Sequence, residues 1–175
     1  SKVVTASLTI PIHQPEGVYS GEQILFEDEN GNGFVDGIEA SDTFTLTVAV
    51  NSFERIQILP SIADLGTIDP GETSVAYDID VFNVGNVAIS GLDGLWNNAD
   101  LTGAGTLDSS LVNFTSITDP LNPGVTSTIQ VTVGPLLSTQ AAGAYSGIQT
   151  LKGQTCELQL QVNSAATAPD LASGT

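Results

Sequence analysis

The sequence predicts an all-β protein built as a β-sandwich. Nearly every segment is a short run of alternating apolar and polar residues bounded by Gly, Pro, Asn or Asp, which is typical of strands joined by tight turns. No segment sustains an apolar period of 3.6 residues, so little room remains for helix. At 175 residues the chain has the length of one domain and can bury a substantial core.

Six ranges carry the clearest strand pattern. Two of them follow a Pro-Gly pair, at 70–71 and at 123–124, where a type II turn needs a fixed φ followed by a positive φ. The last range places Cys156 on an apolar face, so we expect a buried thiol. The predicted strands are residues 43–50, 74–83, 86–91, 125–133, 144–151 and 155–163.

The charge of the chain restricts its partners. Twenty acidic residues stand against 3 basic ones, giving a net charge of -17, so no basic patch could neutralise nucleic acid or an anionic membrane. No apolar run approaches the length of a membrane span. The chain begins at Ser1 and has no Met, and its one cysteine excludes an intramolecular disulfide. We therefore expect a mature, secreted product whose targeting segment has been removed.

Residues 28–39 satisfy the spacing of a twelve-residue EF-hand calcium loop. Calcium takes six to eight hard oxygen ligands, and this spacing supplies side-chain oxygens at positions 1, 3, 5, 9 and 12, a backbone carbonyl at position 7 and a glycine turn at position 6. Gly33 occupies that turn. The alternative is a solvated acidic loop rich in Asn and Gly. The predicted calcium ligands are Asp28, Asn30, Asn32, Phe34, Asp36 and Glu39.

The segments beside this loop resemble strands. Residues 23–26 and 43–50 are rich in β-branched and aromatic side chains, whereas a sensor EF-hand has a helix on each side. The loop resembles those of secreted dockerin-type and surface-adhesin modules. That resemblance implies that calcium acts as a staple of a long connection and not as a signalling switch.

Residues 56–163 resemble an immunoglobulin-like sandwich of archaeal and bacterial surface proteins. The resemblance is carried by Leu-Gly-x-Ile-x-Pro-Gly at 65–71, Phe-Asn-Val-Gly-Asn-Val at 82–87, the second Pro-Gly turn and Ala-Gly-Ala-Tyr-Ser-Gly at 142–147. It implies an immunoglobulin-like or jelly-roll-like β-sandwich with an extended N-terminal strand. The expected division is an arm at 1–14, a sandwich domain at 15–163 that includes the calcium loop, and a tail at 164–175.

The N-terminal arm alternates as a half-buried strand does, and Pro11 ends it. An alternating arm ahead of an immunoglobulin-like body resembles fibre subunits joined by donor-strand complementation, such as TasA-like and archaeal bundling-pilus proteins. In that mode the arm completes the sheet of the next subunit. Alternatively, the arm is the first strand of its own sandwich. The apolar face of the arm, and hence the predicted donor strand, consists of Val4, Ala6, Leu8, Ile10 and Ile12.

The sequence contains few of the residue combinations that catalytic sites need. His13 is the only histidine, and we expect it at the surface, so Ser-His-Asp and zinc-hydrolase sites have no basis. We expect Trp96 to pack beneath a long loop and not to stack on a sugar. Asn113 begins an Asn-Phe-Thr triplet and is a candidate glycosylation acceptor.

Two non-enzymatic functions fit these observations. The first is a structural subunit of an extracellular, calcium-binding filament, a pilus or matrix fibre, whose partner is a second copy of the chain bound head to tail. The second is a monomeric, calcium-stabilised adhesion or ligand-binding module, secreted or at the cell surface.

Overall fold

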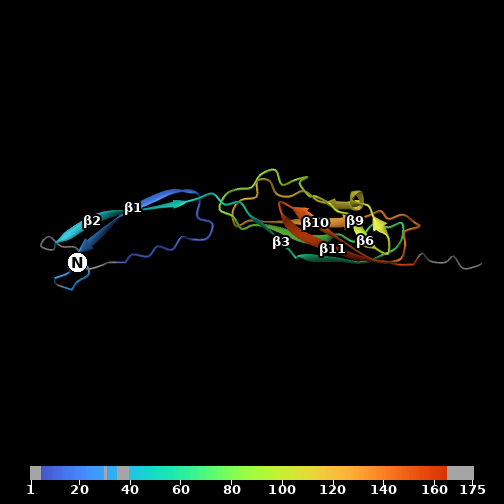
Figure 1. The fold of residues 1–175 in the computed structure, drawn as a ribbon, viewed down its shortest axis with the longest axis horizontal. Coiled ribbons are helices and arrows are strands. Elements are labelled where there is room, and N and C mark those ends of the chain that lie inside the picture. The colour runs from blue at the N-terminus through green and yellow to red at the C-terminus, as the bar shows by residue number, and fades with distance from the viewer. Residues whose placement is uncertain (1–4, 30, 35–39, 165–175) are drawn as a thin grey trace, which may run out of the picture.

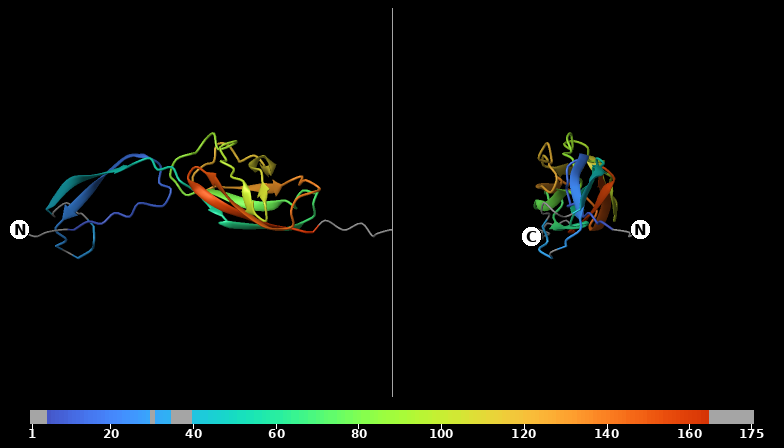
Figure 2. Two further views of the ribbon diagram at one scale, coloured as in Figure 1. Left: turned by 45° about the vertical axis from the view of Figure 1, so that its right-hand side comes forward. Right: turned by 90° about the vertical axis from the view of Figure 1, so that its left-hand side faces the viewer.

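The computed structural model describes residues 5–29, 31–34 and 40–164. The molecule is elongated, and a β-hairpin extends from one end of a β-sandwich (Figure 1). The view along the long axis shows the hairpin in line with the sandwich and not beside it (Figure 2). The hairpin consists of β1 (Gly17–Phe26) and β2 (Ser41–Val50), which pair antiparallel over ten positions.

Two sheets form the sandwich. One has the order β3 (Ile56–Leu59), β5 (Tyr77–Asn83), β9 (Thr126–Val133) and β8 (Val112–Phe114). The other has the order β4 (Ile62–Ile68), β11 (Gln154–Val162), β10 (Gly143–Leu151), β6 (Leu101–Gly103) and β7 (Thr106–Leu107). A single turn of 3₁₀ helix, η1 (Ser109–Leu111), precedes β8.

The strand order is that of an immunoglobulin sandwich. Strands β3, β5, β9 and β8 stand in the places of A, B, E and D, while β11, β10 and β6 stand in those of G, F and C. The first strand is divided between the sheets: β3 pairs with β5, and after Pro60 the chain crosses over so that β4 runs parallel to β11. The predicted all-β, immunoglobulin-like sandwich is therefore confirmed.

A tyrosine corner supports the same assignment. Tyr145 lies near the start of β10, is 2% exposed, and donates a 2.8 Å hydrogen bond from its hydroxyl to the carbonyl of Ala141. A tyrosine at this place in strand F, bonded a few residues upstream, is a hallmark of immunoglobulin-like sandwiches. It belongs to the 142–147 motif on which the sequence resemblance rests.

The core lies between the inner faces of the two sheets. Alternate residues of β5 and β9 point inward, as Ile79, Val81, Ile129 and Val131 are each fully buried. From the other sheet, Cys156 is also fully buried, which confirms the expected buried thiol. The core of the sandwich is thus closed by residues of the sandwich alone.

Most predicted strands are confirmed, but the expected division of the chain differs from the structure. The range 86–91 forms no strand, because only Ile89 makes a bridge, to Leu121. The sandwich starts at β3, so residues 17–50 lie outside it as a separate two-stranded sheet and not within a domain beginning at residue 15. Both Pro-Gly turns are present, with φ of 92° at Gly71 and 73° at Gly124. Helices in the described part of the chain are too short to span a membrane.

Candidate functional site

The predicted calcium loop connects β1 to β2 at the outer end of the hairpin, far from the sandwich (Figure 1). The backbone N–H of Glu27 donates to the carbonyl of Ala40 at 2.9 Å and closes the base of the loop. The loop is thus flanked by paired strands, as the sequence predicts, and not by helices. Calcium binding here could not act by opening a pair of helices.

The described half of the loop is organised around Asp28. Its carboxylate accepts hydrogen bonds from the backbone N–H groups of Asn32, at 3.1 Å, and Gly33, at 3.0 Å. The side-chain carbonyl of Asn32 accepts from the backbone N–H of Phe34 at 2.7 Å. The φ of Gly33 is 78°, the left-handed value that the sixth position of a calcium loop requires. These residues fit a calcium site in kind, because the side chains of Asp28 and Asn32 carry hard oxygens on a tight backbone turn.

Three further predicted ligands, Asn30, Asp36 and Glu39, lie outside the described residues. Among the residues that the structure describes, no group of three or more His, Cys, Asp or Glu side chains is close enough to hold a metal. The calcium site therefore stays a prediction, one that the geometry around Asp28 favours.

The arm forms no strand in its described part, residues 5–14. It runs back along the hairpin, and a turn in which Gln14 donates to Pro11 ends it (Figure 1). The arm is not the first strand of its own sandwich, because β3 and β4 fill that place. Val4 lies outside the described residues. The other predicted donor positions are exposed, namely Ala6, Leu8 at 56%, Ile10 at 47% and Ile12 at 84%.

The face of the hairpin beside the arm is apolar and incompletely covered. Tyr19 and Val48 are cross-strand neighbours on this face, and Leu46 follows Val48 at the same side of β2. Leu8 and Ile10 of the arm line a cavity of about 190 Å³ together with Tyr19 and Val48. Two-stranded hairpins are marginally stable in water unless a further strand or layer packs on them.

The sequence identified the arm but not its neighbour. Residues 17–22 are not predicted as a strand from the sequence, because Gly17 and Gly21 interrupt the alternation of apolar and polar side chains. The sequence signal that could have indicated this strand was Tyr19, together with the apolar residues of β2 with which it pairs. The term N-terminal module is used below for the described residues from 5 to 50.

His13 is not a free surface residue. It is half-buried, its Nδ1 lies 2.7 Å from the carbonyl oxygen of Gly85, and its ring meets that of Phe82 edge-on at 6.2 Å. His13 is thus partly exposed, as a surface residue is, but it is also held by the sandwich. The bend that follows the arm places His13 against the end of the sandwich.

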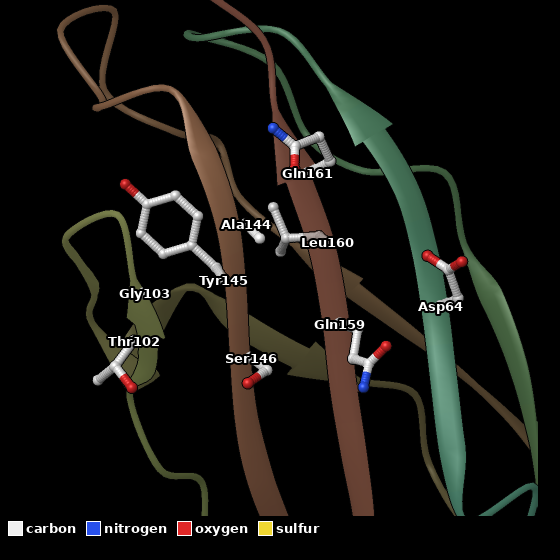
Figure 3. A pocket seen from close by; sticks show the side chains of 9 residues that line it. All are labelled: Asp64, Thr102, Gly103, Ala144, Tyr145, Ser146, Gln159, Leu160 and Gln161. Carbon is white, nitrogen blue, oxygen red and sulfur yellow. The ribbon is translucent and has the colours of Figure 1, made fainter.

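Two hollows lie on the sandwich. The larger, about 470 Å³, is an open polar depression on the outer face of the five-stranded sheet, with Asp64, Thr102, Ser146 and Gln159 on its floor (Figure 3). Asp64 is the single carboxylate among its lining residues, whereas glycoside hydrolysis uses a pair. The depression offers hydrogen bonds but no acid–base pair.

The second hollow, about 420 Å³, adjoins Trp96 and Phe114. Their rings stack on each other at 4.0 Å with 2° between the planes, and both are partly buried and pack against the core. This packing agrees with the structural role expected for Trp96, which stays a prediction. Asn113, on β8, is exposed, and its amide donates to the carbonyl of Leu111 at 3.0 Å. Its exposure is compatible with glycosylation, which stays a prediction.

Comparisons with known proteins identify no family. No protein-family model matches the chain. No curated protein matches it either. Among solved structures, the chain is similar to the ASH/PapD-like domain 7 of human CEP192, with 15% identity over 65% of this chain and 87% of that chain and a TM-score of 0.41. Similarity at this level implies nothing about function.

Proposed function

We propose that the protein is a structural subunit of an extracellular calcium-binding filament, a pilus or matrix fibre, and that it polymerises through its N-terminal arm. The observation that carries the proposal is the exposure of apolar side chains along the arm, beside a hairpin whose own apolar face is only partly covered. The role is structural, with no catalytic activity, and its place is outside the cell or at the cell surface.

The arm of one subunit completes the two-stranded sheet of the next. The sandwich already contains strands in every place of the immunoglobulin order, so it offers no missing strand to replace. The hairpin, in contrast, pairs only within itself among the described residues, and its outer edges carry free backbone donors and acceptors. An extended segment added there gains main-chain hydrogen bonds and buries alternate side chains.

Apolar burial and main-chain hydrogen bonds both work against the cost of ordering the arm. Burial of each large aliphatic side chain stabilises by about 1.5–3 kcal/mol, whereas ordering each residue's backbone costs about 1–2 kcal/mol. Leu8, Ile10 and Ile12 offset part of that cost, and each added main-chain hydrogen bond offsets about 0.5–1.5 kcal/mol more. The face of the hairpin that carries Tyr19, Leu46 and Val48 has few charged residues, so it can approach a second copy despite the net charge of -17.

The proposed contact joins two different surfaces, the arm of one subunit and the hairpin of the next. The arm and the calcium loop lie at one pole, while β11 ends at the opposite pole (Figure 1). A contact between different surfaces of identical subunits does not close on itself unless the rotation happens to form a ring, so it generates a filament.

Calcium, by this proposal, stiffens the outer end of the hairpin. It would be held by Asp28, Asn32 and the carbonyl of Phe34 together with the predicted ligands of the other half of the loop. Joint substitution of Asp28→Ala and Glu39→Ala should abolish the rise in melting temperature caused by calcium. An unchanged calcium response would refute the site, whether or not filaments form.

Electron microscopy of the full chain in millimolar calcium tests assembly directly. The wild type should form long, uniform fibres, and a variant with Leu8→Asp and Ile10→Asp should form none, because charges cannot be buried in the added strand. The matched control carries Thr5→Asp and Ser7→Asp, with the same added charge on the other side of the arm, and should still assemble. Dispersed wild-type particles would overturn the filament proposal.

That outcome would favour the second candidate, a monomeric, calcium-stabilised adhesion or ligand-binding module. The specific observation behind it is the polar depression on the five-stranded sheet, whose floor presents Thr102, Ser146 and Gln159 (Figure 3). Calcium would then serve only to stabilise the hairpin of a single chain.

A further inference from the structure

The loop of residues 83–87 contacts two separate segments. One belongs to the N-terminal module, and the other connects this module to the sandwich. The first is the bend at 13–14, between the arm and β1, and the second is the segment 51–55, which connects β2 to β3. These two segments lie far apart in the sequence, but both touch the same loop at the end of the sandwich that faces the hairpin. The module is therefore attached at a second place besides its covalent connection.

Asn86 joins these segments through its side chain. Its Nδ2 donates to the carbonyl of Gln14 at 3.1 Å and to that of Asn51 at 2.9 Å, while its Oδ1 accepts from the backbone N–H of Phe53 at 2.6 Å. The backbone N–H of Asn86 also donates to the carbonyl of Phe53 at 2.9 Å. One half-buried amide thus bonds the incoming bend and the outgoing segment at once.

The neighbouring contacts restrict the same segments. Gly85 accepts the hydrogen bond of His13, and a Cβ at this position would lie 2.2 Å from the carbonyl oxygen of Phe53, so only glycine permits the close approach. The backbone N–H groups of Val84 and Gly85 both donate to the carbonyl of Arg55, at 2.9 and 3.2 Å. An ion pair between Lys152 and Glu54 holds the exit segment from the other sheet.

We infer that the 83–87 loop is a rigid joint, which holds the N-terminal module at one orientation to the sandwich, and that Asn86 is its positioning residue. Units connected by a single linker normally reorient unless a further interface restrains them. Here a restraint exists without a large apolar interface, because directional hydrogen bonds fix two separate segments to one loop. The inference holds for a monomer as well as for a filament subunit.

The joint leaves the arm itself free to rearrange. Its contacts end at His13 and Gln14, and the turn that starts at Pro11 separates them from Ala6, Leu8 and Ile10. Residues 5–10 can therefore leave their own hairpin without loosening the attachment. The hairpin would keep its direction while the arm changes partners.

Pulsed electron spin resonance on the full chain measures this rigidity. Spin labels at Thr45→Cys, on β2, and Thr126→Cys, on β9, replace exposed residues of the two units, while the buried Cys156 stays unlabelled. Labelled chains are diluted into excess unlabelled protein, so only distances within one chain are recorded, and filament formation does not affect the result. The wild type should give one narrow distance distribution.

The positioning role is tested by Asn86→Ala in the same labelled chain. Loss of three side-chain hydrogen bonds should broaden the distribution about twofold or more, as expected for units freed to reorient. The matched control, Asn113→Ala, removes an amide that bonds only its own neighbourhood and should leave the distribution narrow. Lys152→Ala, at the exposed turn after β10, provides a second variant and should cause a smaller broadening.

Two outcomes would overturn the inference. A broad distribution in the wild type would contradict a rigid joint, whatever the variants do. A distribution as narrow in Asn86→Ala as in the wild type would remove Asn86 from the positioning role. Circular dichroism of each variant identifies loss of the fold, and if Asn86→Ala does not fold, the wild-type and Lys152→Ala measurements decide the question.

Discussion

Asn83 provides the sharpest test of how the sandwich is held together. This fully buried amide donates from Nδ2 to the carbonyls of Val87, at 2.9 Å, and Leu121, at 2.8 Å, and accepts at Oδ1 from the backbone N–H of Gly85 at 2.8 Å. Buried polar groups cost free energy unless they are hydrogen-bonded. We expect Asn83→Ala to destabilise the sandwich because it removes all three bonds from a buried site.

The size of this destabilisation depends on which backbone groups are left without any hydrogen-bond partner. The N–H of Gly85 still reaches the carbonyl of Arg55, and the carbonyl of Leu121 still accepts from Ile89, so only the carbonyl of Val87 loses its sole partner. Three hydrogen bonds at about 0.5–1.5 kcal/mol each, with one newly unsatisfied acceptor, give a loss of about 3 kcal/mol in the free energy of unfolding.

Urea unfolding monitored by fluorescence measures this loss. Trp96 is the only tryptophan and packs against the core, so it reports on the sandwich and not on the hairpin. Asn83→Ala should lower the midpoint with an unchanged m-value. The control Asn163→Ala removes an exposed amide that bonds Asp69 and should change stability by no more than about 0.5 kcal/mol. A loss below about 1 kcal/mol for Asn83→Ala would refute the reasoning.

Three further predictions concern the sandwich. Tyr145→Phe should cost about 1–2 kcal/mol in urea unfolding because it removes the hydrogen bond to Ala141, and an unchanged midpoint would contradict a stabilising tyrosine corner. Burial raises the pKa of the Cys156 thiol, so the contribution of this thiol to the free energy of unfolding should be constant below its ordinary pKa of about 8.5 and fall as pH rises above it. Cys156→Ala should lack that part of the fall, as measured by urea unfolding across the alkaline range. Gly85→Ala should lower the melting temperature, because its Cβ would press on the carbonyl of Phe53; a melting temperature equal to that of the wild type would show that the loop can shift at no cost.

The local pattern predicted the long strands well because each is set by its own residues. β9 alternates Ile129, Val131 and Val133 inward, and the Pro-Gly pair before it adopts the positive φ that the turn chemistry demands. The buried cysteine follows from the same alternation in β11. In these segments, side-chain alternation and tertiary packing agree.

The short strands were missed because the rest of the fold determines them. β3 and β4 are separated by Pro60, and Gly66, with a φ of 72°, interrupts β4, so neither gives a clear period. The range 86–91 has suitable alternation, yet Asn86 is held in the joint by its side chain and the segment pairs only at Ile89. Side-chain hydrogen bonds there compete with a ladder.

The same distinction applies to the candidate site. The spacing of the calcium loop is local, so the sequence alone placed Asp28 and Gly33 correctly on a tight turn between strands. The partner of the arm is not local: apolar alternation predicts a strand but cannot name the sheet that receives it. The attachment of the bend through His13 and Asn86 joins residues 72 positions apart, beyond any local signal.

The divided first strand determines how the sandwich responds to tension. The chain enters the sandwich at β3, near the joint, and leaves it at Val162, at the opposite pole, after β11 has run parallel to β4. A pull on the two ends therefore slides these neighbouring strands past each other along their length. The hydrogen bonds between them are loaded together and not one after another, as they would be if a hairpin were peeled open. The sandwich should therefore resist a pull along its long axis through shear of this strand pair.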